Sequence, residues 1–148
     1  MGEFFVFTRK ISLENWRGLV AWAKSRAESF TIYLYLDENT PELPGSPRYG
    51  DSLFGHRADV RREVNGKIAI LRGALRSASG EDFLRHVQTD LPGIGCPLMS
   101  YDFVGNSGEA VLSVRDLNDV VCKTNAEVNA IEFSRELNLP AGSVRRVV

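Results

Sequence analysis

The residue types that most often perform chemistry are few in this chain, and their spacing fits no familiar catalytic arrangement. The sequence holds two histidines, His56 and His86, which excludes a zinc site built from three histidines. Neither histidine is followed two positions later by the Ser or Thr that two-histidine phosphodiesterases carry. We therefore predict no catalytic residue and no metal site.

Glycine-rich phosphate loops are also missing from the sequence. The chain has no Gly-x-x-x-x-Gly-Lys-Ser/Thr segment, and Gly93-Ile94-Gly95 is followed by Cys96-Pro97-Leu98, without the third glycine of a dinucleotide-binding fingerprint. A turn explains this segment better than a nucleotide site. We therefore predict no cofactor.

Two residues keep an enzymatic interpretation open. Cys96 would be a nucleophile only if the fold placed a histidine beside it, and the proline that follows suits a buried or turn cysteine equally well. His86 has Asp82 and Asp90 four residues away on either side, a spacing that places all three on one helix face. That face fits ordinary solvent exposure better than a general base.

The sequence offers a polar segment suited to binding instead. Asp37 and Glu38 fall at the end of an expected strand, and ligands are commonly met at that end of parallel strands. Tyr and Arg are enriched at the energetic centres of protein interfaces, and both occur just beyond. The candidate binding residues are Asp37, Glu38, Arg48, Tyr49, Asp51, His56, Arg57, Arg61 and Arg62. The alternative is that these side chains only keep a loop and an edge strand soluble.

The elements that position these residues must come from one small domain. The chain has 148 residues, of which 43% are hydrophobic and 25% charged, as in ordinary globular domains. We expect a single α+β domain over residues 1–140 and a short tail over 141–148. A net charge of −1 argues against a strongly basic nucleic-acid binder.

The expected location is the cytoplasm, without a membrane partner. No apolar run approaches the roughly 18 residues that span a bilayer, and Glu3 stands where a signal peptide would carry basic residues. The two cysteines form no C-x-x-C pair, so we expect both to be reduced.

The first third of the chain predicts a strand, a helix and a second strand. Residues 3–9 are rich in aromatic residues, Ser12 is a suitable N-cap for a helix over 13–29, and residues 30–37 alternate with a period of two. A strand-helix-strand order favours a right-handed crossover between parallel strands. A long proline- and glycine-rich connection over 38–56 follows.

Asn65-Gly66 predicts a two-residue hairpin turn of type I′. With that turn, strands 58–64 and 67–71 place Val64 opposite Lys67, and Asp59 opposite Arg72 as an ion pair. The first strand is charged and is expected at a sheet edge, while the second is apolar and expected inside the sheet.

The second half predicts a helix capped by Ser79 and ended by Pro92, strands over 98–104 and 109–115, and a helix over 116–137 capped by Asp116. The expected fold is therefore an α+β domain with a mixed sheet of about six strands and helices mainly on one face.

The function we expect is a non-catalytic cytoplasmic protein-interaction domain, for example a small inhibitor or immunity-type protein that covers a partner's site. The alternative is a small enzyme or a nucleic-acid-binding domain that uses a basic hairpin on phosphates. Its residues would be Arg57, Arg61, Arg62 and Lys67.

Overall fold

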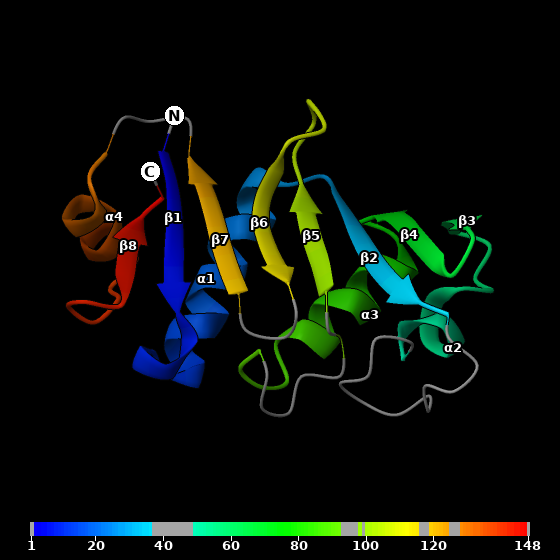
Figure 1. Ribbon diagram of the computed structural model, residues 1–148, viewed down its shortest axis with the longest axis horizontal. Helices are drawn as coiled ribbons and strands as arrows, with labels where there is room; N and C mark the ends of the chain where they lie inside the picture. The colour runs from blue at the N-terminus through cyan, green and yellow to red at the C-terminus, as the bar shows by residue number, and fades with distance from the viewer. Residues whose placement is uncertain are drawn as a thin grey trace.

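The computed structural model describes residues 2–36, 49–92, 98, 100–115, 119–124 and 128–147, with one eight-stranded antiparallel sheet in this part of the chain (Figure 1). The strands are β1 (Gly2–Phe7), β2 (Ser29–Tyr35), β3 (Val60–Asn65), β4 (Ile68–Ala74), β5 (Ser100–Val104), β6 (Ala110–Arg115), β7 (Asp119–Thr124) and β8 (Val144–Arg146). The helices are α1 (Leu13–Arg26), α2 (Gly50–Phe54), α3 (Ala78–Val87) and α4 (Ala130–Glu136), with a 3-10 helix at Thr8–Lys10. The α+β class is confirmed, whereas the six-stranded mixed sheet is wrong.

The sheet order is β3-β4-β2-β5-β6-β7-β1-β8, and every pair of neighbours is antiparallel. The first and second strands are therefore not neighbours, but four antiparallel pairings separate them, so they run in the same direction, as expected. β1 lies between β7 and β8, and β2 lies between β4 and β5. The connection through α1 spans the three strands, β5, β6 and β7, that lie between β1 and β2.

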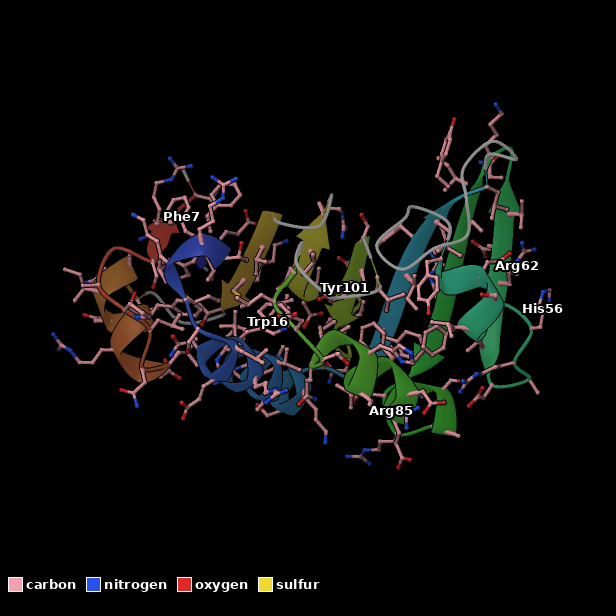
Figure 2. The ribbon with its side chains drawn as sticks, turned by 90° about the horizontal axis from the view of Figure 1, so that it is seen from below. Phe7, Trp16, His56, Arg62, Arg85 and Tyr101 are labelled. Carbon is pink, nitrogen blue, oxygen red and sulfur yellow. The ribbon has the colours of Figure 1, made fainter. Side chains whose placement is uncertain are left out.

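The helices pack on one face of the sheet (Figure 2). The indole Nε1 of Trp16 in α1 donates a hydrogen bond of 2.8 Å to the carbonyl oxygen of Val87 in α3. Phe133 of α4 stacks on Phe4 of β1, with ring centroids 4.5 Å apart. All three aromatic residues are fully buried, so this face of the sheet holds the hydrophobic core.

The opposite face is not covered by any helix in the described part of the chain. Along β2, Phe30, Ile32 and Leu34 are buried in the core on the helix side. The residues between them, Tyr33 among them, point to the other side because side chains alternate along a strand. We call this second side the uncovered face.

Helix α2 lies within the segment that we expected to be a long irregular connection. Phe54, its last residue, is fully buried, with its ring centroid 6.2 Å from that of Phe30. This part of the connection is therefore a helical turn, which the burial of one aromatic ring holds against the sheet.

The first hairpin turns one residue later than predicted. Asn65 pairs with Ile68, so the turn residues are Gly66 and Lys67. Gly66 has a φ of 61°, which suits the first central position of a type II′ turn. Each residue of β3 therefore faces a partner two positions further along β4 than predicted. Because two is an even number, each side chain keeps its predicted face. The edge position of β3 and the interior position of β4 are confirmed.

The predicted ion pair between Asp59 and Arg72 is wrong. Asp59 instead accepts hydrogen bonds from the backbone N–H and the hydroxyl of Ser79, and these bonds hold the pKa of Asp59 below its ordinary value. The cap of α3 is Ser77, whose hydroxyl accepts from the N–H of Gly80. Ser79 lies buried inside the first turn.

The predicted helix over 116–137 is the largest error. Residues 119–124 form β7 between β6 and β1, and the helix α4 starts only at Ala130, after its cap Asn129. Val120 and Cys122 are buried on the core side, as alternation along a strand requires. β-branched residues favour this pleated environment.

The segment expected to be a short tail contains β8, which pairs with β1 along Phe4 to Val6. The strands expected over 98–104 and 109–115 correspond to β5 and β6. The Ser12 cap of α1 is confirmed, with a reciprocal hydrogen bond between Ser12 and Asn15. Among the described residues, no helix is long and apolar enough to cross a membrane.

Candidate functional site

Apolar side chains gather on the uncovered face where β4 and β2 run side by side. The register places Tyr35 opposite Ile68 and Tyr33 opposite Ile70. Tyr35 is 42% exposed and Ile68 is 50% exposed. We call these four residues the tyrosine face. Large hydrophobic side chains that remain exposed together mark an interaction surface more often than scattered ones do.

Charged side chains of β3 and β4 border the tyrosine face. Glu63 of β3 pairs in register with Ile70, and Arg61 pairs with Arg72. Glu63 receives one salt bridge from Arg72 at 3.1 Å and another from Arg61 at 3.3 Å. An apolar centre with a polar, solvent-accessible rim is the usual composition of a protein interface.

A buried polar group holds Tyr33 in place. The hydroxyl of Tyr33 donates a hydrogen bond of 2.7 Å to Asp102 of β5. Arg115 of β6 donates to both oxygens of the same carboxylate, at 2.7 and 3.1 Å. Its guanidinium also lies 4.5 Å from the centroid of the Tyr33 ring. Bidentate charged hydrogen bonds are directional and strong, so the three side chains form one fixed unit.

The electrostatics of this unit follow from the burial of Asp102, whose side chain is 6% exposed. Burial of the Tyr33 phenol, together with its hydrogen bond to the Asp102 carboxylate, raises the pKa of Tyr33. Tyr33 therefore stays protonated and keeps donating to Asp102 at physiological pH.

Besides Arg61, which binds Glu63 of the same strand, three of the predicted binding residues have an internal partner. Arg62 of β3 donates two hydrogen bonds, of 2.9 and 3.0 Å, to the carboxylate of Asp51 in α2. Arg57 binds the carboxylate of Asp82 in α3 and donates from Nε to the carbonyl oxygen of Leu53. These contacts fasten α2 and the segment after it to the rest of the domain.

The remaining candidates divide into three groups. Arg61, with a side chain that is 77% exposed, lies at the rim of the tyrosine face. His56 is exposed, and Tyr49 is half-buried just before α2. Asp37, Glu38 and Arg48 lie outside the described residues.

Of the two residues that kept an enzymatic interpretation open, the structure describes His86. His86 lies with its Nδ1 2.7 Å from the backbone oxygen of Asp82 and its ring against the edge of Phe54. Cys96 lies outside the described residues. Within the described part of the chain, no three His, Cys, Asp or Glu side chains are grouped as a metal site requires.

Sequence reasoning missed the polar unit of Tyr33, Asp102 and Arg115. The alternation of residues 30–37 did place Tyr33 and Tyr35 on the same side of one strand, which was the available signal. Asp102 and Arg115 come from strands that pair only in the folded sheet, so their spacing along the chain did not point to them.

No protein family, no curated protein and no solved structure matches this chain.

Proposed function

We propose that this chain is a non-catalytic, cytoplasmic binding domain that uses its tyrosine face to bind another protein. The observation that carries the proposal is the exposed pair of Tyr35 and Ile68, side by side on the uncovered face. A small inhibitor or immunity-type protein would use such a face to cover a site on its partner.

The properties of the tyrosine face support a protein partner. Tyrosine contributes a large contact area with little loss of side-chain freedom, and Tyr33 is already held by Asp102 and Arg115. A surface that is fixed before binding loses less entropy when a partner docks. Arg61 supplies an exposed hydrogen-bond donor at the rim.

The alternative of a basic hairpin on phosphates receives less support from the same geometry. Arg57 and Arg62 each form a salt bridge with an aspartate, and Arg61 forms one with Glu63. A phosphate would compete with these carboxylates for the three guanidinium groups. Lys67, in the turn, is exposed.

Photo-crosslinking tests the proposal with a matched control. A photoreactive phenylalanine analogue replaces Tyr35 in one variant and Ile131 in another, since Ile131 of α4 is also exposed, at 69%, but belongs to another surface. After irradiation in cells that produce the protein, we expect a discrete crosslinked protein from position 35 alone.

Two results would contradict the proposal: the same products from both positions, or none from position 35. A crosslink to RNA or DNA at position 35, confirmed by nuclease digestion, would replace the protein partner with a nucleic acid.

A further inference from the structure

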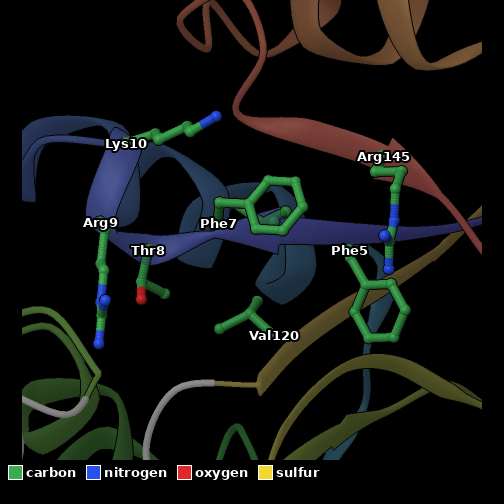
Figure 3. Close-up of a pocket in the computed structure, with 8 residues that line it drawn as sticks. Phe5, Phe7, Thr8, Arg9, Lys10, Val120 and Arg145 are labelled. Carbon is green, nitrogen blue, oxygen red and sulfur yellow. The ribbon is translucent and has the colours of Figure 1, made fainter.

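A pocket of about 440 Å³ lies at the other end of the sheet, where β1 meets β8 (Figure 3). Phe5 and Phe7 alternate along β1 and so point to the same side, and Arg145 pairs in register with Phe5. The guanidinium of Arg145 lies 5.4 Å from the ring centroid of Phe5 and 5.8 Å from that of Phe7.

The 3-10 helix after β1 adds two more cations to the lining. Arg9 and Lys10 both line the pocket, and Lys10 Nζ lies 5.4 Å from the centroid of Phe7. Phe7 is 38% exposed, so part of its ring surface remains accessible to a ligand.

The charge of this pocket is not neutralised by the described part of the protein. Three of the eight lining residues are cations and none is acidic. None of the salt bridges between described residues involves Arg9, Lys10 or Arg145. Lys10 instead donates to the carbonyl oxygen of Gly142 at 3.4 Å, which holds its ammonium group near the pocket.

We propose that this pocket binds a nucleoside monophosphate. A phosphate monoester carries close to two negative charges and several acceptor oxygens, which match the positive charges of Arg9, Lys10 and Arg145 around the pocket. A base can stack on the exposed part of Phe7, as bases do on aromatic side chains. The pocket volume lies within the range of about 300–1,000 Å³ that is usual for small-ligand sites. This inference does not depend on the protein partner proposed above.

Calorimetric titration of the whole chain tests whether both the nucleoside and the phosphate of the ligand contribute to binding. The probes are adenosine, guanosine, cytidine and uridine 5′-monophosphate, with adenosine and inorganic phosphate as truncated ligands. We expect saturable binding of at least one monophosphate, and at least tenfold weaker binding of each truncated ligand. A 5′-phosphorylated oligonucleotide that bound tenfold more tightly than every mononucleotide would instead assign the pocket to the end of a nucleic-acid strand.

Substitutions then locate the binding. Arg145→Gln is expected to weaken monophosphate binding at least tenfold, and Arg85→Gln, at an arginine of α3 that is 70% exposed and lies outside the pocket, is expected to leave it unchanged. Circular dichroism confirms that each variant is folded. If Arg145→Gln does not fold, Lys10→Gln, at an exposed position, takes its place with the same expected loss.

The proposal is overturned if no monophosphate binds, or if inorganic phosphate binds as tightly as the monophosphates. It is also overturned if the substitution in the pocket weakens binding no more than Arg85→Gln does.

Discussion

Arg62 and Arg145 lie on the two opposite edge strands of the sheet and have different surroundings. Arg62 on β3 is joined to Asp51 by two hydrogen bonds, whereas Arg145 on β8 lies against the rings of Phe5 and Phe7. An arginine bound to a carboxylate positions elements of its own chain. An arginine that rests on aromatic rings keeps its charge available for an outside anion.

The largest expected effect comes from the carboxylate that organises the middle of the uncovered face. Asp102→Ala would leave Arg115 without its bidentate partner and Tyr33 without its acceptor. Because Asp102 is buried while Arg115 is partly exposed, we expect a loss of about 2–3 kcal/mol in the free energy of unfolding. Urea denaturation measures this loss.

The matched control for Asp102→Ala is Glu3→Ala, which breaks the exposed pair between Glu3 and Lys123. It should change the free energy of unfolding by less than about 1 kcal/mol. Equal losses in the two variants would mean that the buried unit contributes no more than a surface ion pair.

A smaller loss of stability distinguishes the arginines of the two edge strands. Arg62→Gln should lower the free energy of unfolding by about 1 kcal/mol, because its bidentate bond fastens α2 to the sheet. Arg145→Gln should lower it by no more than about 0.5 kcal/mol, because an exposed cation on a ring contributes little. Thermal and urea unfolding of both variants give the comparison. A larger loss for Arg145→Gln would reverse the roles that we assign to the two residues.

The smallest expected effect appears only in alkaline solution. The folded protein raises the pKa of Tyr33, so the stability linked to its proton is complete below the unfolded pKa of about 10. That stability is lost as the pH rises through the higher pKa of the folded state, where the folded protein also releases the proton. The free energy of unfolding should therefore fall more steeply above pH 10 in the wild type than in Tyr33→Phe. If the free energy of unfolding fell equally with pH in the two proteins, the burial of Tyr33 would not affect its ionisation.

Local sequence patterns predicted the elements that depend on a few neighbouring residues. Ser12 starts α1 because its hydroxyl caps the helix, and the alternation in residues 30–37 gave both faces of β2. The face of each residue in the first hairpin also survived the error in its turn, since the pairing moved by an even number of positions.

The errors have a common physical cause, which is pairing between distant strands. Val120, Val121 and Cys122 fit a helical stripe as well as a buried strand, because a short apolar run has no decisive period. Only the strands on either side, β6 and β1, make this segment part of the sheet.

The candidate site shows the same limit. Asp51 and Arg62 were predicted to face a partner from their residue types, yet each is the other's partner in the fold. A charge can be predicted from sequence, but whether it is already neutralised depends on which elements meet. The tyrosine face emerged only when the order of the strands was known.

The position of β1 also has a consequence for synthesis of the chain. Its neighbours are β7 and β8, so Glu3 finds its partner Lys123 only after most of the chain has been made. At about 5–20 residues per second, the ribosome needs several seconds or more to reach that point. Throughout this time the run of Phe4, Phe5, Val6 and Phe7 has no strand to pair with, and such segments are prone to aggregate. The nascent chain therefore carries an unpaired, aggregation-prone strand well before either surface can bind a ligand.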